Sequence, residues 1–203
     1  MRFDLQVIAS WIKEGSTVLD LGCGEGDLLH LLKSEKGVCG TGIDCDESKI
    51  ARCIERGLSV LQGDINEEIE DYPDKSFDYV IVSQTLQQVY RPDALIGSLL
   101  RIGRKVIVSF PNFGHWRIGL QVLLTGYAPV TSHLPYQWYD TPNIRVITIK
   151  DFRRFSREMD FSIITEVAMK DRDSSARGRI VRILPTVRAT YGIFMIGERT
   201  GQE

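Results

Sequence analysis

The chain of 203 residues is long enough for one large domain with its own core, so it needs neither disulfides nor a structural metal to fold. Hydrophobic residues make up 43% and charged residues 26%, a balance typical of folded globular proteins that excludes wholesale disorder. The formal net charge of -2 provides no protein-wide basic field, so neither nucleic acid nor an anionic membrane is an expected partner.

The cysteines, the histidines and the N-terminus exclude several further classes of protein. The four cysteines include no C-x-x-C pair, and the three histidines lack the spacing of zinc ligands. No apolar run approaches the roughly 20 residues that span a bilayer, and the first residues do not form a secretory signal. We therefore expect a cytoplasmic protein with reduced thiols and no bound metal.

Apolar strands and amphipathic helices alternate along the first 110 residues. Apolar side chains in 1–15 recur at the spacing of one helix face. Beyond it, the pattern predicts strands at 17–21, 38–44, 58–62, 77–83 and 105–110, and helices at 27–36, 46–56 and 92–101. Alternation of this kind predicts βαβ units, a parallel sheet and right-handed crossovers.

The regular pattern fades between residues 111 and 148, which hold four of the seven prolines and two of the three tryptophans. A long irregular segment of this kind is typical of a lid, a binding loop or a partner surface. Beyond it, 151–159 is typical of a helix, and 161–167 and 191–196 of strands. The arginines between 170 and 190 predict a basic, solvated hairpin.

The predicted fold is a single α/β domain with a doubly wound, mostly parallel seven-stranded sheet, whose last strand is antiparallel. The N-terminal helix occupies 1–15, and the cofactor-binding half 16–110. The irregular insertion follows at 111–148, and 149–203 completes the sheet.

A glycine-rich turn is the strongest local indication of a ligand-binding site in this sequence. In V-L-D-L-G-C-G-E-G, residues 18–26, a strand ends at Asp20, and Gly22, Gly24 and Gly26 precede a helix. Glycines let the backbone approach a ligand closely, and the N–H groups at the start of the helix attract a carboxylate or phosphate. The strand–turn–helix context is what the motif requires for cofactor binding.

Two further acidic residues follow successive strands. Asp44 ends the second strand, where a carboxylate can accept both ribose hydroxyls of a nucleoside. Asp64 follows the third strand, where it could receive an adenine amino group. A single such Asp is more often a cap or turn residue, but three in register with successive strands favour a nucleoside site.

The turn reads G-x-G-x-G instead of the G-x-G-x-x-G that seats a pyrophosphate, and Asp20 would repel a pyrophosphate, so NAD is disfavoured. The arrangement resembles the class I S-adenosylmethionine-dependent methyltransferases. That resemblance implies that the first motif holds the methionyl part, the second-strand acid the ribose, and the residues after the third strand the adenine. The implied cofactor-binding residues are Asp20, Gly22, Cys23, Gly24, Gly26, Asp44, Cys45, Asp64 and Ile65, with Ser83 and Gln84 lining the donor and substrate pocket.

Three longer motifs narrow the resemblance. They are S-Q-T-L-Q-Q-V at 83–89, R-I-G-R-K-V-I-V-S-F-P-N-F-G-H-W-R at 101–117 and L-P-Y-Q-W-Y-D-T-P-N-I at 134–144. With them, residues 2–196 resemble the methionine biosynthesis protein MetW family. The resemblance implies a link to methionine biosynthesis and an association with the homoserine O-acyltransferase MetX, but it implies no methyl acceptor.

Two functions follow as alternatives. The first is methyl transfer from S-adenosylmethionine to a small molecule, with His115 and Tyr139 as candidate catalytic residues. His115 follows the fifth strand, near the edge of the sheet where ligands bind, and could act as a base or substrate ligand. It could equally serve to order the insertion. The second function is that of a non-catalytic partner subunit of MetX that senses S-adenosylmethionine.

Overall fold

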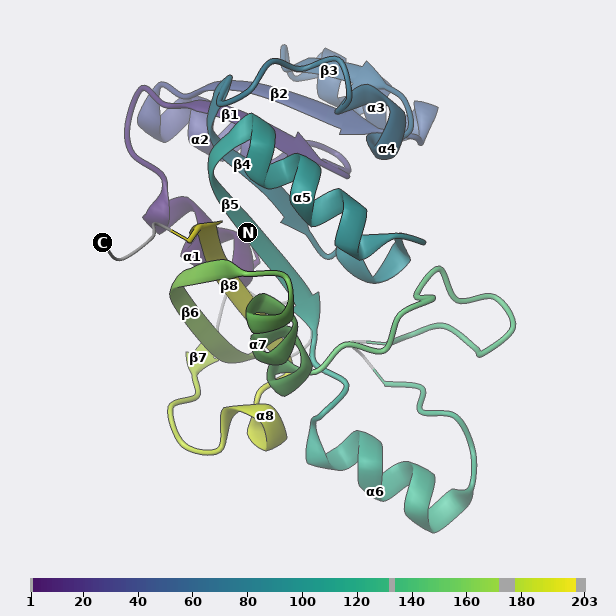
Figure 1. Ribbon diagram of the computed structural model, residues 1–203. Coiled ribbons are helices and arrows are strands. Elements are labelled where there is room, and N and C mark those ends of the chain that lie inside the picture. The colour runs from purple at the N-terminus through teal and green to yellow at the C-terminus, as the bar shows by residue number, and fades with distance from the viewer. Residues whose placement is uncertain (1, 132–133, 172–177, 200–203) are drawn as a thin grey trace.

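An eight-stranded sheet forms the centre of the computed structural model, which describes residues 2–131, 134–171 and 178–199 (Figure 1). The strand order is β3-β2-β1-β4-β5-β8-β6-β7. The first five strands pair in parallel, whereas β8 is antiparallel to both of its neighbours. The strands are β1 (Thr17–Leu21), β2 (Cys39–Asp44), β3 (Ser59–Gln62), β4 (Phe77–Ser83), β5 (Gly103–Pro111), β6 (Phe161–Asp171), β7 (Gly178–Ile180) and β8 (Tyr191–Glu198).

Helices cover both faces of the sheet, as a doubly wound fold requires (Figure 1). The helices α1, α2 and α3 pack on one face, and α5 and α7 on the other. The helical elements are α1 (Phe3–Trp11), α2 (Asp27–Lys36), α3 (Glu47–Glu55), α4 (Ile65–Glu68), the 3-10 turn η1 (Leu86–Gln88), α5 (Pro92–Ile102), α6 (Trp116–Thr125), α7 (Ile149–Glu158) and α8 (Pro185–Arg188).

Residues 79–82 of β4 are apolar without alternation, because both faces of this strand are buried. Val80 and Val82 join the core beneath α5 and α7, whereas Tyr79 and Ile81 join the core beneath α1 to α3. Since side chains alternate across a strand, a strand covered on both faces must be apolar throughout. Each fully buried aliphatic side chain contributes about 1.5–3 kcal/mol to the hydrophobic free energy of folding.

The strand count predicted from the sequence was one too low. The additional strand is β7, three residues long, which pairs antiparallel with β6 at the edge of the sheet. Three residues carry too few positions for a period-two pattern to be recognised. The antiparallel β6–β7 pair lies where the basic hairpin was expected, although Arg172 and Arg177 lie outside the described residues.

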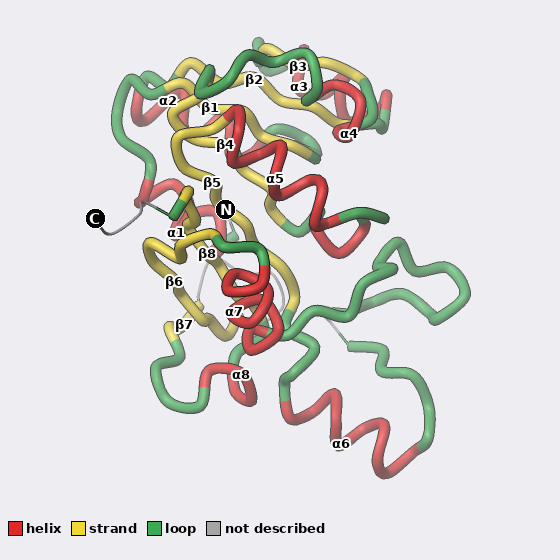
Figure 2. The backbone as a smooth tube through the Cα atoms, viewed as in Figure 1, coloured by secondary structure: helices red, strands yellow, loops and turns green. Residues whose placement is uncertain are grey.

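The insertion is not irregular throughout, because it contains α6, ten residues long (Figure 2). No residue of this helix is buried, and Leu123 and Leu124 are 80% and 72% exposed. Its segment, W-R-I-G-L-Q-V-L-L-T, places Arg117, Gln121 and Thr125 on one narrow polar face at i, i+4 and i+8, and carries apolar side chains around most of the rest of the helix. Within the described part of the chain, no helix is long and apolar enough to cross a membrane.

Candidate functional site

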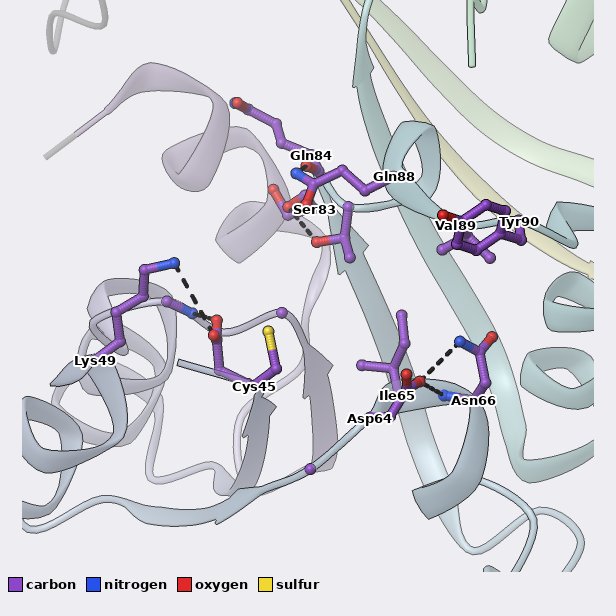
Figure 3. Close-up of a pocket in the computed structure, with 15 residues that line it drawn as sticks. Cys45, Lys49, Asp64, Ile65, Asn66, Ser83, Gln84, Gln88, Val89 and Tyr90 are labelled. Atoms are coloured by element: carbon purple, nitrogen blue, oxygen red, sulfur yellow. Dashed lines mark hydrogen bonds and ion pairs between the residues drawn. The ribbon is translucent and has the colours of Figure 1, made fainter. Parts of the chain in front are cut away.

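Two adjoining cavities lie at the carboxyl ends of the parallel strands. The larger, of about 390 Å³, is bordered by the ends of β2 and β4 and by the segments that follow β1 and β3 (Figure 3). The smaller, of about 240 Å³, shares Gly22, Gly24, Lys49 and Ser83 with it. The cavities are lined by all of the predicted cofactor residues except Gly26: Gly22, Gly24, Asp44, Cys45, Asp64, Ile65, Ser83 and Gln84 line the larger, while Asp20 and Cys23 line the smaller.

The glycine turn forms the wall between the cavities. Gly22 has φ +74°, and a Cβ there would collide with the Thr85 side chain. Gly24 has φ +58°, but a Cβ there would meet no atom within 4 Å, so its open side faces space instead of protein. The turn therefore needs glycine at both positions for its backbone conformation, and at Gly24 it also leaves room for a ligand. Gly26 instead ends the turn as the N-cap of α2 and packs against Leu58 and Cys53.

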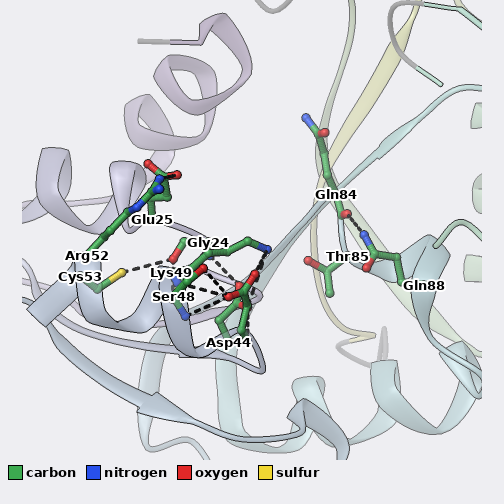
Figure 4. Close-up of polar contacts among 12 residues, drawn as sticks. Gly24, Glu25, Asp44, Ser48, Lys49, Arg52, Cys53, Gln84, Thr85 and Gln88 are labelled. Atoms are coloured by element: carbon green, nitrogen blue, oxygen red, sulfur yellow. Dashed lines mark hydrogen bonds and ion pairs between the residues drawn. The ribbon is translucent and has the colours of Figure 1, made fainter. Parts of the chain in front are cut away.

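Asp44 joins the glycine turn to the start of α3 (Figure 4). Its carboxylate accepts hydrogen bonds from the backbone N–H of Gly24 at 2.8 Å and of Asp46 at 3.0 Å. The Lys49 Nζ lies 4.0 Å from the same carboxylate. The side chain is only 8% exposed, and these contacts fix it at the border of the larger cavity. Because a carboxylate has about four acceptor positions, this one can still accept hydrogen bonds from a diol.

Asp20 lies deeper, with a relative exposure of 3%, at the wall of the smaller cavity. Burial, and secondarily the charge of Asp44, raises the pKa of Asp20 to about 7. Among the described residues, no group donates a hydrogen bond to this carboxylate. A cationic ligand in the smaller cavity would supply the missing charge and donors, and would favour the ionised form.

This raised pKa makes the stability of the free protein depend on pH. The folded pKa lies above the ordinary value of 3.8, so the folded state binds more protons than the unfolded state between about pH 4 and 7. The contribution of Asp20 to the free energy of unfolding should therefore fall as pH rises through this window, by on the order of 4 kcal/mol.

Asp20→Asn should remove this contribution, because asparagine is uncharged at every pH. Urea unfolding of both proteins from pH 4 to pH 8 measures it. The difference in unfolding free energy between variant and wild type should grow in favour of the variant as pH rises to 7. Parallel pH curves for the two proteins would contradict the burial of an ionisable Asp20.

The segment after β3 forms the far wall of the larger cavity (Figure 3). Asp64 is exposed and is the N-cap of α4, accepting hydrogen bonds from the Asn66 N–H and Nδ2, both at 2.8 Å. Ile65 is half-buried beside it and supplies an apolar surface. Cys45 is exposed at the end of β2. A flat heterocycle could pack against Ile65 while Asp64 receives its amino group.

Ser83 and Gln84 form the wall at the end of β4. The Ser83 hydroxyl bonds to the Ser109 hydroxyl at 2.9 Å. Gln84 adopts φ +57°, a strained conformation for a residue other than glycine, and its Nε2 donates to the Asp4 carboxylate at 2.8 Å. Residues held in this region often mark functional sites.

Cys23 lines the smaller cavity with a neutral thiol, whereas His115 and Tyr139 lie outside both cavities. Cys23 is buried, and burial raises the pKa of its thiol well above the usual range, so it is neutral. His115 is buried and is the N-cap of α6, its Nδ1 accepting from the Arg117 N–H at 3.3 Å. Tyr139 is 71% exposed beside Trp138. Neither His115 nor Tyr139 lines either cavity.

Several cavity residues were not predicted from the sequence. Lys49 was readable in principle, since it lies one helical turn beyond Asp46, the N-cap of α3. Arg2 and Leu5 approach the smaller cavity through tertiary packing that no local pattern reveals. The others lie beside predicted residues in the sequence; they are Glu25, Asp27, Leu28, Gly63, Asn66, Thr85, Gln88, Val89 and Tyr90.

The family model of the methionine biosynthesis protein MetW matches residues 2–196. This chain belongs to the MetW family. A MetW relative, the bifunctional methionine biosynthesis protein MetXA/MetW of Rhodopirellula baltica, is 32% identical over 176 residues, which are 82% of this chain and 28% of that protein. The ubiquinone/menaquinone biosynthesis C-methyltransferase UbiE of Xylella fastidiosa strain M23 is 33% identical over 70% of this chain and 54% of its own length. The chain thus spans between about a quarter and a half of these curated relatives.

Solved structures share the fold at lower identity. A SAM-dependent methyltransferase from Archaeoglobus fulgidus superimposes with a TM-score of 0.70 at 16% identity, covering 95% of this chain and 90% of that one. TrmK of M. capricolum, solved with S-adenosylhomocysteine, has a TM-score of 0.60 at 11% identity and covers 100% of this chain and 71% of its own. The MetW chain therefore has the class I methyltransferase fold, and its family acts in methionine biosynthesis.

Proposed function

We propose that this MetW chain binds S-adenosylmethionine or S-adenosylhomocysteine across the two adjoining cavities. The observation that carries the proposal is the placement of three carboxylates, on Asp20, Asp44 and Asp64, along the cavities that the glycine turn divides. Asp44 would hold the ribose hydroxyls, and Asp64 with Ile65 the adenine. Asp20, buried and without a hydrogen-bond donor among the described residues, would accept the methionyl ammonium.

The open side of Gly24 supports the fit, because a ligand crossing from one cavity to the other would pass over it. A dinucleotide fits less well. Its pyrophosphate would lie beside the turn, near Asp20 and Asp44, where repulsion between like charges opposes it.

Two roles remain for such a protein. Methyl transfer to an unidentified small molecule is an in-line displacement that mainly needs positioning, with a base only for a protonated acceptor. The candidate bases do not favour it, since His115 is buried as a helix cap and Tyr139 is exposed on the insertion.

The second role, a partner subunit of homoserine O-acyltransferase, has two observations in its favour. In Rhodopirellula baltica a MetW relative is part of a bifunctional MetXA/MetW protein. In this chain, α6 and the aromatic residues that follow it expose large apolar side chains, and such surfaces mark interaction sites. We therefore propose that the chain is an S-adenosylmethionine-binding partner of that acyltransferase.

Purification of the tagged protein from its own cells, followed by mass spectrometry, tests both parts of this proposal. We expect S-adenosylmethionine or S-adenosylhomocysteine among the bound small molecules, and the acyltransferase among the bound proteins. Release of S-adenosylhomocysteine during incubation with S-adenosylmethionine and a cell extract would instead favour methyl transfer. Absence of both the ligand and the acyltransferase would contradict the proposed function.

A further inference from the structure

One wall of the larger cavity is formed by the segment that follows β4. Gln88, Val89 and Tyr90 line this cavity. Val89 and Tyr90 lie on the side away from Cys45 and Lys49 (Figure 3). Val89 is buried in the core beneath α5 and α7, whereas Tyr90 is 78% exposed. A ligand that fills the cavity therefore packs against this wall, and the position of the wall contributes to the fit.

Arg145, near the end of the insertion, holds this wall through hydrogen bonds to its backbone carbonyls. A helix end leaves carbonyls that have no partner within the helix itself, and the wall follows the end of the 3-10 turn η1. The Arg145 N–H donates to the Gln87 carbonyl at 3.0 Å. The guanidinium donates from Nε to the Val89 carbonyl at 3.3 Å and from Nη2 to the Tyr90 carbonyl. One residue of the insertion thus makes three hydrogen bonds to the wall.

The residue next to Arg145 connects this contact to the aromatic part of the insertion. Val146 lines a hollow of about 200 Å³ together with Leu86 of η1 and Phe152 of α7. Val146 also lines a second hollow, of about 210 Å³, together with Trp138. Residues 145 and 146 therefore lie between the wall of the ligand cavity and the exposed aromatic residues for which we propose a partner.

Two sites joined in this way are coupled when a ligand at one of them restricts motion at the other. A ligand packed against the wall restricts the wall and, through the three hydrogen bonds, the insertion. A partner that then binds the insertion has less conformational freedom to remove, so it binds more tightly. By thermodynamic reciprocity, the partner raises the affinity for the ligand by the same factor.

We propose that Arg145 couples the ligand cavity to the partner surface of the insertion, so that a bound ligand strengthens association with the partner. Arg145 is a positioning residue, because it contacts the wall but lines neither of the two ligand cavities. The inference rests on the proposed function and adds the regulation of that site.

Hydrogen exchange followed by mass spectrometry measures the coupling without the partner. The reporter is the segment 134–143, in which the Leu134 and Asp140 N–H groups donate to nearby carbonyls. Saturating S-adenosylhomocysteine should slow exchange there by at least about fivefold in the wild type, the lower end of typical coupling between sites. In Arg145→Ala, also saturated with ligand, the slowing should be less than about twofold. Absence of slowing in the wild type, or equal slowing in both proteins, would overturn the role of Arg145.

Two matched variants separate the hydrogen bonds from packing and from general stability. Arg145→Met keeps the aliphatic part of the side chain without its donors and should behave like Arg145→Ala; full slowing in it would overturn the role of the hydrogen bonds. Arg101 also donates to backbone carbonyls, those of Tyr72 at 2.7 Å and Ile69 at 3.0 Å, but does not contact the insertion through them. Arg101→Ala should keep the wild-type slowing. Its loss there as well would overturn a specific role of Arg145.

Titration of the purified acyltransferase measures the same coupling at the partner surface. S-adenosylhomocysteine should tighten association at least about fivefold for the wild type and less than about twofold for Arg145→Ala. If the wild type binds both ligand and acyltransferase but the ligand leaves the association unchanged, the coupling is wrong and the proposed function stands. A wild type that binds no S-adenosylhomocysteine would contradict both.

Discussion

Replacing Asp44 by alanine should weaken the binding of S-adenosylhomocysteine ten- to a hundredfold. The Asp44 carboxylate is buried at the border of the larger cavity and fixed by two backbone N–H groups, so it is oriented before a ligand arrives. Hydrogen bonds to a charged group contribute about 1.5–3 kcal/mol, and both ribose hydroxyls would lose their acceptor. Isothermal titration of the purified variant and wild type measures the loss.

Two further variants separate ligand contact from local structure. Asp44→Asn keeps an acceptor for the turn and should lose less affinity than alanine. Asp46→Ala removes the neighbouring carboxylate, which caps α3 but does not line either cavity, and should cost about 1 kcal/mol of stability with little change in affinity. Unchanged affinity in Asp44→Ala would show that the ribose does not lie at β2.

Replacing Trp138 by alanine should weaken association with homoserine O-acyltransferase by about 2 kcal/mol or more, roughly thirtyfold, as for an anchor residue. Trp138 is 76% exposed and packs edge-on against Tyr139, with 5.7 Å between the ring centroids. Exposed aromatic pairs of this kind are suited to bury apolar area against a partner. Pull-down of the purified acyltransferase by wild type and variant at graded concentrations measures the change.

Two controls accompany this experiment. Ile54→Ala removes a side chain that is 61% exposed on α3, outside the insertion, and should leave the association unchanged. Titration with S-adenosylhomocysteine should give the same affinity for Trp138→Ala as for the wild type. If Trp138→Ala still binds the acyltransferase but no longer binds S-adenosylhomocysteine, the result would indicate that the insertion is a substrate lid. A wild type that never binds the acyltransferase would contradict the partner proposal.

The parts of the site that the sequence predicts are those encoded locally. A strand with an acid as its penultimate residue, a turn with glycine at positions of positive φ and a helix start occur together in residues 17–27, so their order alone indicates a ligand site. Asp44 and Asp64 could be predicted as site residues because parallel strands bring the carboxyl ends of the strands to one edge of the sheet. No contact between distant segments has to be known for either inference.

The parts that the sequence did not predict depend on contacts between distant residues. Asp4 and Gln84 are 80 residues apart, and nothing near Arg2 in sequence indicates that it lines the same cavity as Asp20. The helix α6 was missed for another reason: the prolines and aromatic residues of 111–148 indicated an irregular segment, and the helical spacing of Arg117, Gln121 and Thr125 within it was not used. The large apolar side chains that α6 exposes are the property that favours a partner for it.

The most direct test of the central claim is isothermal titration of the wild-type protein with S-adenosylhomocysteine and, separately, with NAD. The arrangement of Asp20, Asp44 and the glycine turn predicts saturable one-to-one binding of S-adenosylhomocysteine and far weaker binding of NAD. Absence of S-adenosylhomocysteine binding, or equal affinity for the two ligands, would contradict the assignment of the cavities.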